Sequence, residues 1–172
     1  MSGKVFGGRR VTREEVASIV QMISSAGLDD FCVKYEVCGS YRRERPDSGD
    51  IDIVLIPKNL DDFNKWYETL LWEKKIGKLA YYLMIDGVQV DLFIATQSNW
   101  GSMVLNYTGP PGFNQFVGYW CRSMGLNFTR SDIRDLSGNV LSDGFDEKDI
   151  FNLINMEFIE PKNRQTLLGA QT

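Results

Sequence analysis

The chain has 172 residues, a net charge of −4 and no histidine. This length suits one globular domain or two small subdomains. The lack of histidine excludes Ser/His and Cys/His nucleophiles and the HExxH zinc site, so proton transfer must fall to carboxylates, lysine, tyrosine or water. An isoelectric point near 4.9 counts against a nucleic-acid partner, because phosphate binding usually leaves a basic footprint.

The sequence shows neither a long apolar run nor a secretory signal, so we expect an intracellular protein without a membrane segment, acting as a monomer. Cys32, Cys38 and Cys121 form no CxxC pair. Such a set argues against a disulfide framework or a cysteine zinc site, and we expect these thiols to be reduced and mostly buried.

Helical and extended patterns alternate in the first half of the chain. Thr12 and Glu15 form a capping box ahead of apolar residues at helical spacing, and Gly27 ends this predicted helix. Strands, a longer helix and a hairpin turned by Asp86-Gly87 are predicted to follow. The predicted strands span residues 31–38, 51–56, 81–85 and 88–95, and the longer helix spans residues 60–75 with Phe63, Trp66, Leu70 and Leu71 on its apolar face.

The second half begins with a helical pattern at Asn99. The glycine-proline cluster at residues 108–112 interrupts it before the helix resumes through Met124, and a mix of short strands with a helix at residues 146–155 follows. The sequence predicts an α+β fold in two parts: residues 1–104 with a mixed β-sheet and helices, and residues 105–172 as a small α+β subdomain.

Carboxylates occupy alternate positions in one predicted strand. Asp50 and Asp52 flank Ile51, so both point to the same side. Asp91 lies in another strand, and three carboxylates converge if the two strands are neighbours. Such a cluster favours Mg²⁺, and two ions suit an in-line phosphoryl displacement. Alone, an Asp-x-Asp pair also occurs on exposed strand faces and at turns.

A second motif precedes this pair. Gly39 lets the backbone approach an anion, Ser40 supplies a hydroxyl donor, and Arg42 and Arg43 supply guanidinium groups that can grip a phosphate. A phosphate-binding turn next to clustered carboxylates is more specific than either motif alone, and it favours nucleotidyl transfer.

In combination, these motifs resemble the signature of family X DNA polymerases, the group that includes DNA polymerase beta. The resemblance implies a nucleotidyltransferase palm and a C-terminal nucleotide- and DNA-binding subdomain. It also implies dNMP transfer from a dNTP to a primer 3′-hydroxyl on primer-template or gapped DNA, in short-gap base excision repair. The matching stretches are Cys38–Arg43, Ser48–Ile53, Val90–Leu92, Tyr107–Gly109, Phe113–Asn114, Asp146–Phe151 and Glu160–Arg164.

The resemblance further implies roles for single residues. Asp50 and Asp52 would each hold both Mg²⁺ ions, for which Mn²⁺ can substitute, and Asp91 would hold the catalytic ion and help to deprotonate the primer hydroxyl. The implied nucleotide-binding residues are Arg13, Gly39, Ser40, Arg43, Asn106, Tyr107, Gly109 and Asn114, and the predicted DNA-binding residues are Arg42, Arg122 and Arg130.

Several positions depart from the family pattern or allow a second interpretation. Gln89 stands where many relatives have an arginine, and Gly118 replaces an arginine that checks the template pair in polymerase beta, so we expect low fidelity. Arg13 is equally compatible with a solvated charge in the first helical turn, and Tyr107 with a core aromatic residue. Because the printed sequence starts at the palm motifs, we expect no lyase domain, as in minimal viral members.

Two other functions remain open from the sequence. One is a nucleotidyltransferase that acts on an untemplated DNA end, an RNA or a small molecule, which the acidic composition favours. The other is an inactive module that binds DNA ends or proteins. Three mutually repelling carboxylates argue against the inactive module.

Overall fold

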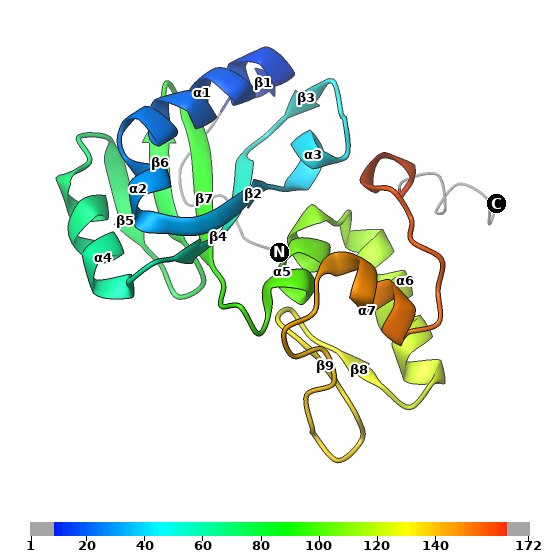
Figure 1. The fold of residues 1–172 in the computed structure, drawn as a ribbon. Helices are drawn as coiled ribbons and strands as arrows, with labels where there is room; N and C mark the ends of the chain where they lie inside the picture. The colour runs from blue at the N-terminus through cyan, green and yellow to red at the C-terminus, as the bar shows by residue number, and fades with distance from the viewer. Residues whose placement is uncertain (1–8, 165–172) are drawn as a thin grey trace. The chain divides into compact units, whose positions relative to one another are not determined.

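The computed structural model describes residues 9–164, which form two compact units (Figure 1). One unit comprises the described residues up to Tyr41 together with Arg45–Ala95, and the other comprises Arg42–Glu44 and the described residues from Thr96 onward. The division predicted after residue 104 falls within α5 (Trp100–Thr108) and stays a prediction. Between residues 9 and 164, none of the helices combines the length and apolar character that a membrane-crossing helix needs.

A five-stranded mixed sheet forms the centre of the first unit, with strand order β2-β4-β7-β6-β5. The β4 and β7 strands pair in parallel, and the other neighbours pair antiparallel, so the predicted mixed sheet is confirmed. A small second sheet pairs β1 with β3. The strands are β1 (Val11–Thr12), β2 (Cys32–Val37), β3 (Asp47–Ser48), β4 (Ile51–Pro57), β5 (Glu73–Ile76), β6 (Tyr81–Ile85) and β7 (Val88–Ile94).

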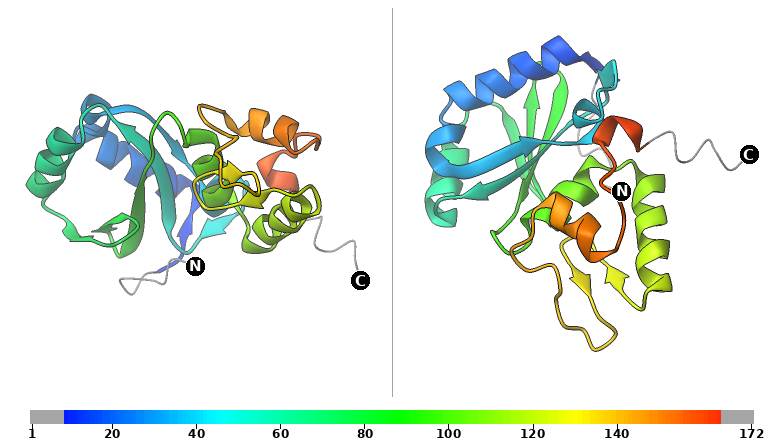
Figure 2. Two further views of the ribbon diagram at one scale, coloured as in Figure 1. Left: turned by 90° about the horizontal axis from the view of Figure 1, so that it is seen from below. Right: turned by 45° about the vertical axis from the view of Figure 1, so that its right-hand side comes forward.

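Three helices of this unit share one apolar core with the sheet: α1 (Arg13–Ser25), α2 (Leu28–Phe31) and α4 (Leu60–Thr69). The predicted capping box starts α1, because the Thr12 side chain accepts a hydrogen bond from the Glu15 amide. Figure 2 gives two further views of α1 along the sheet. The core takes alternate strand residues, including Ile53 and Leu92. The intervening residues of β4 and β7 therefore point to the opposite face.

The helix predicted for residues 60–75 is shorter than expected. α4 ends at Thr69, and Glu73–Ile76 pairs with β6 as the edge strand β5. Leu71 is fully exposed instead of lying on an apolar helix face, whereas Phe63 and Trp66 are buried as predicted. Strand pairing at the sheet edge thus overrides the helical propensity of the Glu and Lys residues in this segment.

The second unit packs three helices and a short hairpin around its own apolar core. The core includes Phe113, Val117 and Phe151. Asp146 caps the N-terminus of α7 through a capping box that it shares with Asp149. The elements are α5 (Trp100–Thr108), α6 (Pro111–Ser123), β8 (Asn127–Phe128), β9 (Ile133–Arg134), α7 (Glu147–Leu153) and the 3₁₀-helix η1 (Pro161–Asn163).

Gly101 of α5 lies against the backbone that leads into α7. Its amide donates a 3.0 Å hydrogen bond to the Phe145 carbonyl oxygen. A Cβ at this position would lie 2.5 Å from the carbonyl oxygens of Phe145 and Asp146. Backbone atoms cannot swing aside as a flexible side chain can, so only glycine allows this approach.

Gly101→Ala is therefore expected to lower the free energy of unfolding by about 1–3 kcal/mol, the usual cost of overpacking. Urea denaturation measures this change. Gly118→Ala in α6 is the matched control, because a Cβ there would meet only the end of the Arg122 side chain at 4.0 Å. Equal effects of the two substitutions would contradict the packing argument.

Candidate active site

The acidic residues lie on the sheet face opposite the apolar core of the first unit. Parallel pairing sets Asp52 of β4 directly beside Asp91 of β7, while Ile53 and Leu92 form the next pair. Asp50 directly precedes β4 and lies in a bend, outside the paired residues. The two strands are neighbours, which was the condition for convergence, and they bring two of the predicted ligands, Asp52 and Asp91, together on one face.

Asp91 is completely buried and has a defined amide partner. The Gln89 side chain is 1% exposed, and its Nε2 donates a 2.7 Å hydrogen bond to Asp91 Oδ1. The two side chains point to the same face because they are two residues apart on β7. The sequence marks Gln89 as a departure from the family pattern, but this contact has no local signature that could have predicted it.

The turn after β2 approaches the same acidic residue, Asp52. The Cys38 amide donates a 2.7 Å hydrogen bond to the Asp52 carbonyl oxygen. Gly39 follows with a φ of +57°, and a Cβ there would collide with Asp52 Oδ2. Both the left-handed conformation and the close carboxylate require glycine at this position. Here the helical turn α3 (Gly39–Arg42) begins, which the sequence did not predict.

Hydroxyl and guanidinium groups hold this turn from two sides. Ser40 Oγ donates a 2.8 Å hydrogen bond to Ser48 Oγ, which links the turn to the strand ahead of Asp50. Arg13 Nη1 donates a 2.7 Å hydrogen bond to the Tyr41 carbonyl oxygen, and its guanidinium lies 4.4 Å from the centre of the Tyr41 ring. The Arg13 side chain is therefore not a purely solvated charge.

The remaining predicted residues belong to the second unit. Arg42 Nη1 donates to Thr108 Oγ1 at 2.8 Å, and Arg43 donates to the Thr108 carbonyl oxygen. Thr108 ends α5, and Gly109 follows with a φ of +60°. Arg43 thus places a cation at the carbonyl end of this helix, where positive charge is favourable.

Asn106 and Asn114 are joined across the turn between α5 and α6, because Asn114 Nδ2 donates a 2.7 Å hydrogen bond to the Asn106 carbonyl oxygen. Tyr107 is half-buried near the end of α5, and Arg130 is exposed between β8 and β9. Arg122 is exposed on α6, and its guanidinium lies 4.7 Å from the centre of the Tyr119 ring. The roles of these residues stay predictions.

The candidate metal ligands of this site are carboxylates. Among residues 9–164, no three or more His, Cys, Asp or Glu side chains are arranged as a group that could hold a metal ion. The donor types nevertheless suit a hard cation, since Asp50, Asp52 and Asp91 offer only carboxylate oxygens, and Asp52 and Asp91 lie side by side on neighbouring strands. The three cysteines are free and buried, as predicted, and burial raises the pKa of Cys32 to about 12 and of Cys121 to about 11, so neither is a thiolate at neutral pH.

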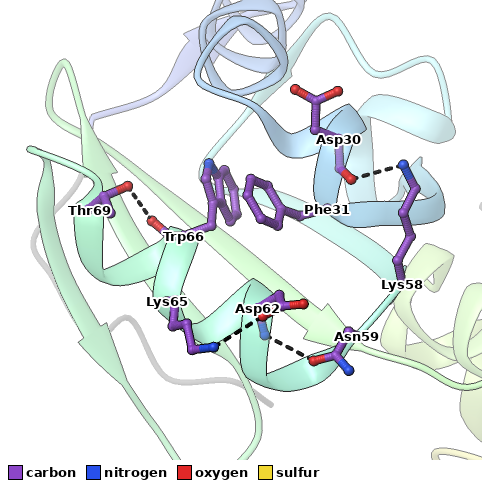
Figure 3. Close-up of a pocket in the computed structure, with 8 residues that line it drawn as sticks. All are labelled: Asp30, Phe31, Lys58, Asn59, Asp62, Lys65, Trp66 and Thr69. Carbon is purple, nitrogen blue, oxygen red and sulfur yellow. Dashed lines mark hydrogen bonds and ion pairs between the residues drawn. The ribbon is translucent and has the colours of Figure 1, made fainter.

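A pocket of about 440 Å³ lies elsewhere on the first unit, between α2 and α4 (Figure 3). Phe31 and Trp66 stack at its wall with ring centres 5.6 Å apart. Lys58 Nζ donates to the Asp30 carbonyl oxygen at 2.8 Å. The pocket contains none of the predicted site residues, and we assign it no role in the chemistry. Its lining is Asp30, Phe31, Lys58, Asn59, Asp62, Lys65, Trp66 and Thr69.

Comparison with known proteins connects both units to one family. The profile of the DNA polymerase beta palm matches residues 10–101, and that of the DNA polymerase beta thumb matches residues 103–165. The DNA polymerase type-X family protein pol4 of Schizosaccharomyces pombe is 26% identical over 192 residues, which cover 92% of this chain and 38% of pol4.

Two further relatives extend the comparison. DNA polymerase lambda of Rattus norvegicus is 23% identical over 90% of this chain and 33% of its own length. DNA polymerase IV of Saccharomyces cerevisiae is 26% identical over 65% of this chain and 22% of its own length. The chain thus spans well under half of each relative. Since the palm profile alone covers more than half of the chain, the chain belongs to the family X DNA polymerases.

Proposed function

We propose that the chain is a DNA-directed DNA polymerase that transfers dNMP from a dNTP to a primer 3′-hydroxyl. The observation that carries the proposal is the placement of Asp52 beside Asp91 on one sheet face, with the Gly39 turn against the Asp52 carboxylate. An acidic pair next to a turn that can accept an anion suits a reaction between a hydroxyl and a triphosphate. Membership of the family X polymerases supports the same reaction.

Asp50, Asp52 and Asp91 would hold the two Mg²⁺ ions, or Mn²⁺ in their place, and the ions would neutralise charge on the attacking oxygen and the phosphates. Asp91 accepts the proton of the primer hydroxyl. The hydroxyl oxygen then bonds to the α-phosphorus as the bond to pyrophosphate breaks. Asp91 suits this role because Gln89 occupies its Oδ1 and fixes the orientation of the carboxylate.

The nucleotide would bind through the residues that the family resemblance implies. The Gly39 amide, the Ser40 hydroxyl and Arg43 would bind the β- and γ-phosphates, and Arg13 would add positive charge to the triphosphate site. Asn106, Tyr107, Gly109 and Asn114 would contact the sugar and base, and Arg122 and Arg130 the DNA backbone. Arg42 contacts Thr108 and Glu147, so we assign it no direct contact with the nucleotide.

Short-gap filling in DNA repair is the biological role that we propose for this reaction. The net charge of −4 specifically favours a second candidate, transfer to an untemplated DNA end, an RNA or a small molecule. Extension of gapped DNA with Mg²⁺ and one dNTP at a time tests the choice. Incorporation of the complementary nucleotide alone supports gap filling, and incorporation regardless of the template supports the second candidate. A protein that extends none of these acceptors would contradict both.

Asp91→Asn keeps the shape of the side chain and removes the proton acceptor. We expect kcat to fall roughly 100- to 10,000-fold, the contribution typical of a general base, while dNTP binding stays close to that of the unaltered chain. Single-turnover extension and equilibrium nucleotide titration measure the two quantities. Asp61→Asn, at an exposed position on α4, is the control. Normal turnover by Asp91→Asn would rule out the assignment of the base.

Gln89→Leu tests whether the amide matters to the chemistry. Loss of the hydrogen bond to Asp91 should lower kcat about 10-fold or more, as is common when a partner of a metal ligand is removed, with little change in dNTP affinity. Gln21→Leu, at an exposed amide on α1, controls for the change of residue type. An unchanged kcat in Gln89→Leu would show that Asp91 does not depend on this contact.

A further inference from the structure

A buried ion cluster in the second unit joins Arg42 to Glu147 and Arg164, which lie more than 100 residues later in the chain. Glu147, the first residue of α7, lies with Oε2 2.9 Å from Arg42 Nη2 and with Oε1 2.8 Å from Arg164 Nη1. Arg42 Nη1 also donates to Glu147 Oε1 at 3.0 Å. The exposed fractions of the side chains are 7% for Glu147, 20% for Arg42 and 0% for Arg164. One carboxylate therefore fixes two arginines away from solvent.

Three aromatic rings surround the Arg164 guanidinium. Its guanidinium carbon lies 5.2 Å from the Phe113 ring centre, 5.5 Å from that of Phe151 and 5.9 Å from that of Phe158. Its Nε donates a 3.0 Å hydrogen bond to the Ile159 carbonyl oxygen. These contacts hold the Arg164 guanidinium in place, and Arg164 in turn holds Glu147 Oε1.

Stability alone is a weak reason for such an arrangement. Desolvation of charged groups offsets most of the attraction between them, and apolar residues of similar volume are commonly at least as stable in their place. Apolar side chains in these positions could not orient Arg42, because apolar contacts have no preferred direction. A carboxylate held by Arg164 on one side presents its other oxygen to Arg42 in a defined geometry.

Arg42 also contacts the segment that is predicted to bind the nucleotide. Its Nη1 donates to Thr108 Oγ1 at 2.8 Å, and the adjacent Arg43 donates to the carbonyl oxygen of the same residue. Thr108 stands between Tyr107 and Gly109, which are both predicted to contact the sugar. Glu147 thus lies at the start of a chain of contacts that ends at Arg43 and this turn.

We propose that Glu147 is a positioning residue for nucleotide binding: it holds Arg42, Arg42 holds Thr108, and the Thr108 carbonyl oxygen in turn holds Arg43. The inference rests on the proposed function, in which Arg43 binds phosphate. Glu147 itself touches no substrate in this account. Arg42 likewise serves as a link and not as a DNA contact.

The experiment measures dNTP affinity with a primer that lacks the 3′-hydroxyl, so that binding is read without turnover. The variants are Glu147→Gln, which removes the charge, and Thr108→Val, which removes the hydroxyl acceptor but leaves both ion pairs. Arg43→Ala and its combinations with each of them complete two double-mutant cycles. Glu157→Gln, an exposed carboxamide substitution in the same unit, is the control.

We expect Glu147→Gln and Thr108→Val each to weaken dNTP binding about 10-fold, in line with the loss of a hydrogen bond to a charged group. In the Arg43→Ala background, the same substitutions should change the affinity less than about twofold, because the residue through which they act is gone. Glu157→Gln should bind dNTP normally. Thermal unfolding of every variant reports its stability, and Thr108→Val carries the test alone if Glu147→Gln does not fold.

Three results would overturn the proposal in distinguishable ways. If Arg43→Ala weakens binding but the second substitution adds its full effect, Glu147 and Thr108 do not act through Arg43, and the proposed function stands without this inference. If Arg43→Ala leaves the affinity unchanged, the phosphate assignment of Arg43 fails and the inference fails with it. A purely structural role for Glu147 would lower the unfolding temperature and leave the affinity of the folded protein unchanged, which also contradicts the proposal.

Discussion

The parallel register between β4 and β7 is the constraint on which the acidic site depends. It sets Asp52 beside Asp91 while Ile53 and Leu92, on the opposite face, enter the core under the helices. A slip of β4 by one residue would drive Asp52 into that core and expose Ile53. Burial of the apolar face therefore determines where the acidic face lies, and the carboxylates need no attraction of their own to come together.

The same register positions the Gly39 turn, which is predicted to bind phosphate. The Asp52 carbonyl oxygen accepts a hydrogen bond from the Cys38 amide, and the Asp52 carboxylate packs against Gly39. The residue predicted to be a metal ligand therefore also determines the shape of the turn. In the second unit, too, one residue has two structural roles. Glu147 begins α7 and also engages Arg42, next to the Gly101 contact that packs α5 against the start of α7.

Local sequence patterns were enough to predict the features that depend on contacts between residues close together in the sequence. The Thr12 capping box, the alternation around Asp52 and the Asp86-Gly87 hairpin all appear in the structure, the last with positive φ at both turn residues. The β5 strand was missed because its Glu and Lys residues favour a helix and only pairing with β6 makes them extended. Contacts over long sequence distances, such as Arg42 with Glu147, leave no local signature at all.

The central claim is that the face shared by β4 and β7 is where the reaction occurs. Anomalous diffraction from crystals grown with Mn²⁺ and a non-hydrolysable dNTP locates the metal independently of turnover. We expect anomalous peaks within bonding distance of the carboxylates of Asp52 and Asp91, with the triphosphate at the Gly39 turn. Peaks confined to other residues, with this face left without metal or nucleotide, would contradict it.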